Sequence, residues 1–182
     1  MSPATPVTTM NAVDRSWEER VAALWHDATT LPADELVRRA DLLADELDPG
    51  DPRASFERAC ARDTGGFEGE AEQHYRMALA SGRLDSYRSA RATIQLASTL
   101  RILGRLDESE LLLVAELDRR LQPSHDRALH DEARATLALT YVSQGRAVEA
   151  AGLALSALAP RLSRYNRSIA ANAAELVAQT WR

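Results

Sequence analysis

The same short pattern occurs three times in this chain: a glycine, a glutamate four residues later, and a small residue directly after the glutamate. The three segments are GFEGEAEQHY from Gly66, GRLDESELLL from Gly104 and GRAVEAAGLA from Gly145. A glycine is typical of the point where a helix ends and the chain turns back, because it accepts a positive φ. A glutamate suits the first turn of the following helix, where the helix dipole favours negative charge. The pattern therefore predicts a repeated helical hairpin.

The composition favours helices throughout. The 182 residues are 45% apolar and 27% charged, with only eight glycines and seven prolines, and Ala, Leu, Arg and Glu are good helix formers. We expect an all-α fold of about nine helices joined by short loops. Apolar periodicity begins near Asp14, and the sequence DPGDP at 48–52 interrupts it. The first expected helix begins near Asp14 and carries an apolar stripe from Trp17 to Trp25. The others span about 31–47, 54–62, 68–80, 86–103, 107–121, 126–143, 148–158 and 163–179.

These helices group into one domain at 14–182, preceded by a flexible tail at 1–13. Clear repeats cover about 90–123 and 131–160, and a weaker copy covers about 53–82. The N-terminal hairpin at 14–48 has no motif of its own, and the helix at 163–180 is expected to cap the array. Small residues at matching positions predict close helix crossings: Ala97, Ser109, Ala138 and Ala150.

The spacing of Leu, Ala, Tyr or Leu, the turn glycine and then Ala resembles the tetratricopeptide repeat. The stretches RASFERACARDTGG, ARATIQLASTLRILGRLDE and SALAPRLSRYNRSIAANA are similar to small actinobacterial tetratricopeptide-repeat proteins. The resemblance implies a right-handed superhelix (an α-solenoid) and a non-catalytic role in protein binding. Two features depart from the family pattern. The turn motif recurs after 38 and 41 residues instead of about 34, and Arg58 and Arg62 occupy apolar positions of the weaker copy.

In this family the first helix of each pair lines a concave groove, so the resemblance also implies a set of groove residues. In the two clear repeats and the weaker copy these are Arg91, Ile94, Gln95, Ser98, Arg101 and Ile102, then Glu132, Ala135, Leu139, Val142 and Ser143, then Phe56 and Cys60. We expect Arg91 and Arg101, with Arg53, to bind an acidic peptide segment or a carboxylate terminus, and the apolar residues to take a Leu-like anchor. Alternatively, these arginines are solvated or pair with acids on adjacent helices. The Lys and Asn pattern with which tetratricopeptide chaperone adaptors clamp a terminal carboxylate is absent, which disfavours that class of partner.

The residues do not predict an enzyme, a cofactor or a metal site. The four histidines share no helical face at ligand spacing, and Cys60 alone is more typical of a small buried residue than of a nucleophile. Two function classes remain. The first is a scaffold that binds a protein or peptide in the groove, and the second is a regulatory or sensor module that binds a small acidic ligand or a signalling peptide.

The net charge and the cysteine content limit which partners and which cellular compartment we expect. The net charge of −5 argues against nucleic acid as a partner, and no apolar run is long enough for a signal peptide or a membrane span. One cysteine cannot form an internal disulfide, so we expect a cytoplasmic protein, and arginine as the only strong base suggests a bacterial source. Trp17, Trp25 and Trp181 lie near the ends of the expected array, where they either cap it or join two copies into a homodimer.

Overall fold

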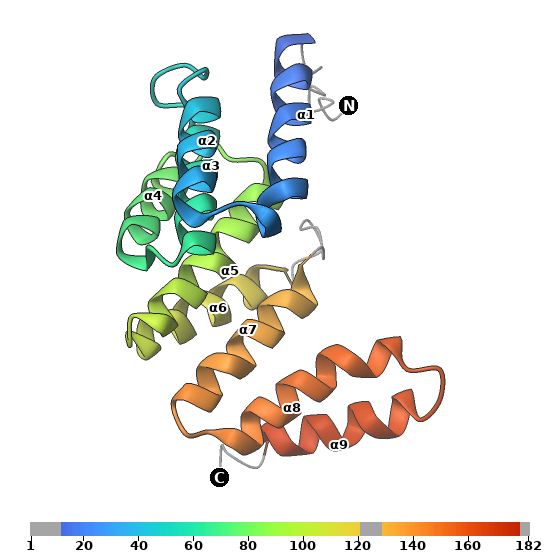
Figure 1. Cartoon of the computed structure of the whole chain (residues 1–182). Helices are drawn as coiled ribbons and strands as arrows, with labels where there is room; N and C mark the ends of the chain where they lie inside the picture. The colour runs from blue at the N-terminus through green and yellow to red at the C-terminus, as the bar shows by residue number, and fades with distance from the viewer. Residues whose placement is uncertain (1–11, 121–128, 179–182) are drawn as a thin grey trace, which may run out of the picture.

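The computed structural model describes residues 12–120 and 129–178. Over these two ranges the chain forms nine α-helices and no strand, arranged as successive antiparallel hairpins (Figure 1). Short 3-10 turns follow α1 and α8, at Ala28–Thr30 and Ala159–Arg161. The helices are α1 (Ala12–Asp27), α2 (Ala33–Ala44), α3 (Pro52–Gly65), α4 (Glu68–Ala80), α5 (Ser86–Ile102), α6 (Leu106–Arg120), α7 (His130–Ser143), α8 (Ala147–Leu158) and α9 (Asn166–Ala178).

The helices agree with the sequence prediction except near some ends. Helix α3 starts two residues earlier than expected, because Asp51 caps it by accepting a hydrogen bond from the Arg53 backbone N–H at 2.9 Å and Pro52 takes the first helical position. Helix α9 starts at Asn166 instead of 163, after Tyr165, whose φ is +62°. The expected tail at 1–13 and the expected start of a helix at 126 fall largely outside the described residues.

The three motif glycines end helices as predicted. Gly66, Gly104 and Gly145 have φ values of +80°, +79° and +80°. In each turn the N–H of the next residue bonds back over five residues at 2.8 Å, as in Arg105 to Leu100 and Arg146 to Tyr141. This is the pattern of a helix end closed by a left-handed residue. The repeated motif therefore encodes the hairpin turn directly.

The small residues lie where helices cross, as predicted. Ala97, Ala138 and Ala150 are buried in one cluster with Leu113, which joins α5, α6, α7 and α8. Ser109 on α6 and Thr140 on α7 are both buried, and their hydroxyls bond to each other at 2.9 Å. A larger side chain at these positions would separate the helices.

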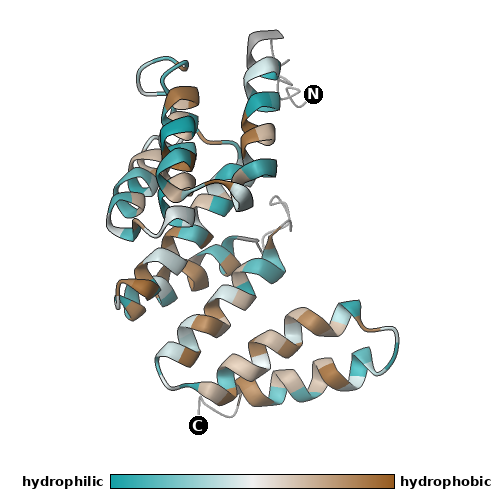
Figure 2. Ribbon diagram, in the orientation of Figure 1, coloured by the Kyte–Doolittle hydropathy of each residue, from teal (hydrophilic) through white to brown (hydrophobic). Residues whose placement is uncertain are grey.

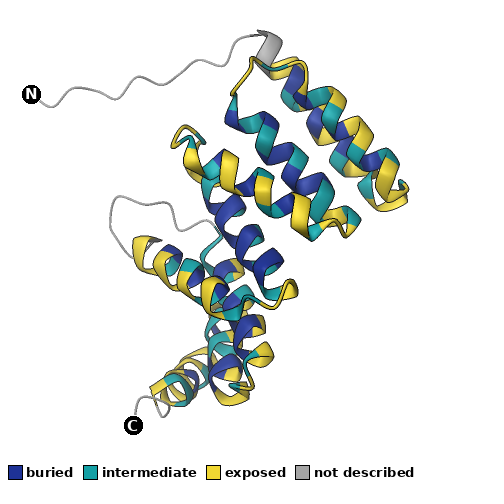
Figure 3. Ribbon diagram, turned by 90° about the vertical axis from the view of Figure 1, so that its left-hand side faces the viewer, coloured by how far each residue is buried: buried dark blue, intermediate teal, exposed yellow. Residues whose placement is uncertain are grey.

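The core is a series of local clusters, as expected for stacked hairpins. One cluster joins α1, α2 and α3, a second joins α3, α4 and α5, and a third joins α5 to α8. Buried residues consequently follow the array from end to end (Figure 3), and apolar and polar residues alternate along the helices (Figure 2). The first helices of consecutive hairpins also touch, since α3 contacts α5 and α5 contacts α7. We call α1, α3, α5 and α7 the inner helices.

Tryptophans on α1 pack within the chain. Trp17 is buried, and its indole Nε1 donates to the Leu43 carbonyl at 2.7 Å. Trp25 is half-buried and donates from Nε1 to Glu57 on α3 at 2.7 Å. Both therefore join α1 to the following helices, and Trp181 lies outside the described residues. At the other end α9 lies beside α8, with which it makes a close contact at Gly152 (Figure 1).

Arg58 and Arg62 take apolar positions of the weaker repeat because α2 offers them carboxylates. Arg62 Nη1 contacts Asp41 at 2.9 Å, and Arg58 pairs with Asp41 at 3.5 Å and with Asp45. Ion pairs thus join the N-terminal hairpin to α3, in addition to the apolar cluster of α1, α2 and α3.

Candidate partner-binding surface

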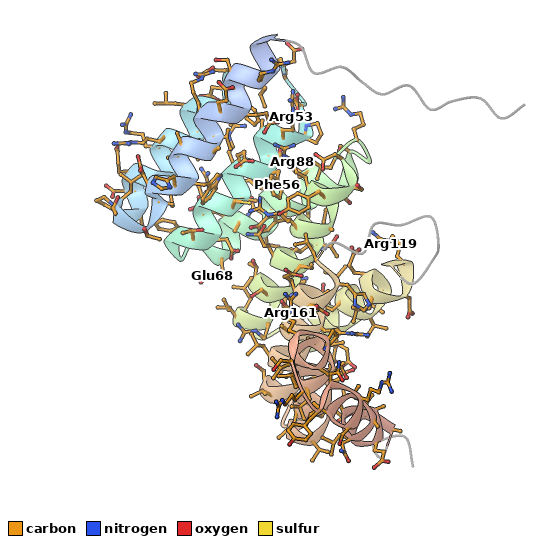
Figure 4. All side chains as sticks on the ribbon, turned by 90° about the vertical axis from the view of Figure 1, so that its right-hand side faces the viewer. Arg53, Phe56, Glu68, Arg88, Arg119 and Arg161 are labelled. Atoms are coloured by element: carbon orange, nitrogen blue, oxygen red, sulfur yellow. The ribbon has the colours of Figure 1, made fainter. Side chains whose placement is uncertain are left out.

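A cavity of about 510 Å³ opens between three inner helices. Helix α1 contributes Glu18, Val21, Ala22 and Trp25, and helix α5 contributes Tyr87, Arg88 and Arg91. Helix α3 contributes Glu57. We call this the α1–α3–α5 pocket. Figure 4 labels Arg88, which lines the pocket, together with Phe56 and Arg53.

Glu57 is a buried carboxylate on the wall of this pocket. Its side chain is 4% exposed, and among the described residues its one hydrogen-bond donor is Trp25, which contacts Oε2. Burial raises the pKa of Glu57, and the Trp25 hydrogen bond and the charges of Arg88 and Arg91 oppose that shift. No described residue donates a hydrogen bond to the second carboxylate oxygen.

Arg91 lies between two aromatic rings. Its guanidinium carbon is 5.2 Å from the centroid of the Phe56 ring and 6.0 Å from that of Tyr87. Within the described ranges, Arg91 makes no ion pair and its guanidinium donates no hydrogen bond. Stacking on aromatic faces orients the group while its N–H donors stay available. Arg91 is therefore placed to bind an anionic group.

The two other groove arginines differ from Arg91. Arg53 pairs with Asp51 at 2.7 Å and with Glu18 at 3.7 Å, and it lies over the Trp17 ring at 5.2 Å. Arg53 therefore holds α1 against α3. This is the alternative role given above, in which an arginine pairs with an acid on an adjacent helix. Arg101 on α5 is half-buried, and its Nε has no hydrogen-bond partner within the described part of the chain.

Three residues expected to line the groove are instead buried. Phe56 is 0% exposed and lies under Arg91, so it supports the groove wall without being open to a partner. Cys60 is 1% exposed, and its thiol contacts Gln95 Oε1 at 3.5 Å. Burial raises the pKa of Cys60 to about 12, which excludes a reactive thiolate near neutral pH. Ile94 packs into the cluster between α5 and α8.

Further along the inner helices, the expected groove positions are exposed and apolar. Ile102 on α5 is 53% exposed, and Leu139 and Val142 on α7 are 53% and 59% exposed. We call these three residues the apolar strip. On α7, Glu132, Ala135 and Ser143 are also exposed. On α5, Gln95 and Ser98 are half-buried. Helices α5 and α7 are in contact, so the strip spans two consecutive hairpins.

Sequence reasoning missed Glu57, Trp25 and Tyr87 as pocket residues. The groove positions of the repeat motif do not include them, and the pocket depends on α1, which has no motif. One signal was available, since Glu57 lies one residue after Phe56, a predicted groove position. Among the described residues, no cluster of His, Cys, Asp and Glu is placed to hold a metal, and none of the described helices is long and apolar enough to cross a membrane.

Comparison with known proteins agrees with this architecture. The family model described as "Tetratrico peptide repeat" matches residues 52–176, which leaves α1 and α2 outside the match. The chain is also similar to a crystal structure of a Podosopora anserina putative kinesin light chain with nearly identical TPR-like repeats. That similarity has a TM-score of 0.65 at 16% identity and covers 90% of this chain and 92% of the other, so it concerns the fold alone. No curated protein matches the sequence.

Proposed function

The chain belongs to the tetratricopeptide-repeat family, whose repeats generally mediate protein–protein interaction, and we propose that it binds a partner protein through the inner helices. The apolar strip is the main contact, and it takes an aliphatic side chain of the partner. The proposal rests on one observation. Three large aliphatic side chains, each more than half exposed, lie at groove positions on two helices that touch each other. Burial of such a patch against a partner is favourable.

Arg101 adds a charge to this surface. It lies one residue before Ile102, and no carboxylate pairs with it within the described ranges. An acidic residue of the partner, close to the aliphatic anchor, would gain a charge-assisted hydrogen bond there. The proposed partner is therefore a peptide segment with one aliphatic side chain and a neighbouring Asp or Glu.

The test is a selection from a random peptide library on the purified chain, followed by affinity measurements on the enriched peptides. The double variant Leu139→Ser with Val142→Ser should weaken binding by about tenfold or more, which corresponds to about 1.4 kcal/mol. The matched control is Leu111→Ser with Val114→Ser on α6. These side chains are also exposed, but α6 is the second helix of its hairpin and not an inner helix. Equal losses in the two double variants, or no loss in the first, would reject the strip as the binding surface.

The acidic part of the peptide motif has a separate test. Arg101→Gln should lower the affinity for peptides with Asp or Glu and reduce the salt dependence of binding, because one ion pair is lost. Affinity for the same peptide with Asn or Gln in place of the acid should stay the same in this variant. A loss for both peptides would mean that Arg101 acts on the fold.

A further inference from the structure

Among the described residues that line the α1–α3–α5 pocket, one group of each charge forms no ion pair within 4 Å. Arg88 and Glu18 on the rim form an ion pair with each other, and Arg88 also contacts Asp85 at 2.9 Å. The remaining charged residues of the lining are Arg91 and Glu57. Within the described residues, Arg91 has no ion-pair partner and only one oxygen of the Glu57 carboxylate accepts a hydrogen bond. Both line the same cavity of about 510 Å³.

A ligand with a single charge would suit one of these residues and not the other. An anion on Arg91 would bring negative charge toward the buried Glu57 carboxylate, and a cation on Glu57 would meet Arg88 and Arg91. Two like charges in a site of low polarity repel strongly. A ligand with both charges avoids this conflict, since each of its charged groups meets an opposite one.

We propose that this pocket binds a small zwitterion of the α-amino-acid type, with its carboxylate on Arg91 and its ammonium group on Glu57. Val21, Ala22, Trp25 and Tyr87 complete the walls, and these favour an apolar side chain on the ligand. The cavity has the size of a small-molecule site. The pocket lies in the N-terminal part of the helical array, between α1, α3 and α5. The proposal therefore does not depend on the apolar strip.

The burial of Glu57 supports this assignment. A carboxylate that is 4% exposed loses most of its hydration, and the Trp25 N–H replaces part of it. An ammonium group would supply further N–H donors to the same carboxylate. Trp25 and Tyr87, the aromatic residues of the wall, also favour a cation beside their rings.

The first test uses the unmodified protein and four ligands. L-leucine and L-phenylalanine carry both charges, N-acetyl-L-leucine lacks the ammonium group, and L-leucinamide lacks the carboxylate. Calorimetry and thermal shift should show binding of the two amino acids at about millimolar concentration or below. The two blocked compounds should bind about tenfold more weakly or worse. They also represent the ends of a peptide, so equal binding of either one would assign the pocket to a peptide terminus and overturn the proposal.

The second test pairs each ligand change with a protein change. Arg91→Gln should weaken binding of L-leucine by about tenfold but not that of L-leucinamide, which has no carboxylate to lose and meets one like charge fewer. Glu57→Gln keeps an acceptor for Trp25, and it should weaken binding of L-leucine. Binding of N-acetyl-L-leucine should stay the same or improve, because the carboxylate that repels this anion is gone. The matched controls are Arg164→Gln and Glu175→Gln, two exposed residues near and on α9, which should bind L-leucine normally.

Three results would overturn the proposal: no binding of either amino acid, blocked compounds that bind equally well, or full affinity in both Arg91→Gln and Glu57→Gln. If a variant does not fold, as judged by its helical circular dichroism, the comparison of ligands on the unmodified protein still decides. The Leu139→Ser with Val142→Ser variant should bind L-leucine normally. If that variant loses peptide binding but still binds L-leucine, the apolar strip and the α1–α3–α5 pocket are separate sites.

Discussion

Arg146 donates from Nη1 to Glu110 Oε1 at 2.8 Å and thereby joins the turn between α7 and α8 to helix α6 of the preceding hairpin. Arg105 makes the same contact with Glu72 at 2.6 Å one hairpin earlier. Each arginine directly follows a turn glycine, and each glutamate lies six residues after the previous turn glycine. The turn motif therefore carries a contact between neighbouring hairpins as well as the turn itself.

We expect this contact to contribute measurably to stability. A double-mutant cycle of Arg146→Met and Glu110→Gln should give a coupling free energy of about 0.5 to 1 kcal/mol in urea unfolding. Arg146 also lies 3.7 Å from the Tyr141 ring centroid and 2.6 Å from Glu149, so it is held in one orientation. High salt should reduce the coupling.

The control cycle uses Arg38 and Glu35, a pair within α2 whose arginine side chain is 60% exposed. Their coupling should stay below about 0.5 kcal/mol, as for other pairs of this spacing on one helix. A coupling for Arg146 and Glu110 that is no greater than this control would show that the contact between hairpins adds nothing to stability.

The turn glycines should be required for backbone reasons alone. Gly104 has a φ of +79°, and a Cβ built on it would have no atom within 4 Å. Gly104→Ala should therefore lower the free energy of unfolding by about 1 to 2 kcal/mol, the cost of a left-handed conformation for a residue with a side chain. Gly104→Asn should cost less, because asparagine adopts this conformation more readily. Chemical denaturation measures both, and equal losses for Ala and Asn would contradict this explanation.

The buried carboxyl of Glu57 should make stability depend on pH. Burial raises its pKa in the folded protein above the ordinary value of 4.5, against the effects of Trp25, Arg88 and Arg91, and the charge of Glu18 adds to the increase. The folded state then holds this proton to a higher pH than the unfolded chain does. Stability is lost as the pH rises from 4.5 through the raised pKa.

The Glu57→Gln substitution removes this loss of stability at rising pH. Without ligand, the stability of the variant relative to the unmodified protein should increase as the pH rises above 4.5, and it should then level off. Carboxylates with lowered pKa values, such as Glu72 and Glu110, are present in both proteins and cancel in the difference. Urea unfolding across this pH range measures the effect, and a constant difference would mean that the pKa of Glu57 is not raised.

The sequence predicts those features that depend on local geometry. The turn glycines, the small residues at Ala97 and Ala138 and most helix bounds follow from backbone conformation and periodicity. The exposure of Leu139 and Val142 also follows from the position of each residue around its helix. These features need no knowledge of the neighbouring hairpins.

Burial at the groove positions could not be predicted in this way. A repeat motif gives the direction of a side chain but not its depth, and Phe56 is covered by Arg91 from the next inner helix. Similarly, Glu57 is buried because Trp25 of α1 reaches it, and α1 carries no motif to place it. The apolar positions taken by Arg58 and Arg62 are explained only by carboxylates on α2.

The contact between α8 and α9 gives a last prediction, in which two glycines should respond in opposite directions. A Cβ on Gly152 would lie 2.8 Å from Val177 Cγ2 and 2.9 Å from the Ala173 carbonyl oxygen. Because the oxygen belongs to the backbone of α9, Gly152→Ala must displace that helix, and overpacking of this kind costs about 1 to 3 kcal/mol. Gly69 in the first turn of α4 has no atom within 4 Å of such a Cβ. Gly69→Ala should therefore stabilise by about 0.4 to 1 kcal/mol, through lower entropy of the unfolded chain. Hydrogen exchange should show faster exchange in α9 for Gly152→Ala alone, and unchanged protection there would mean that α9 is not held by this contact.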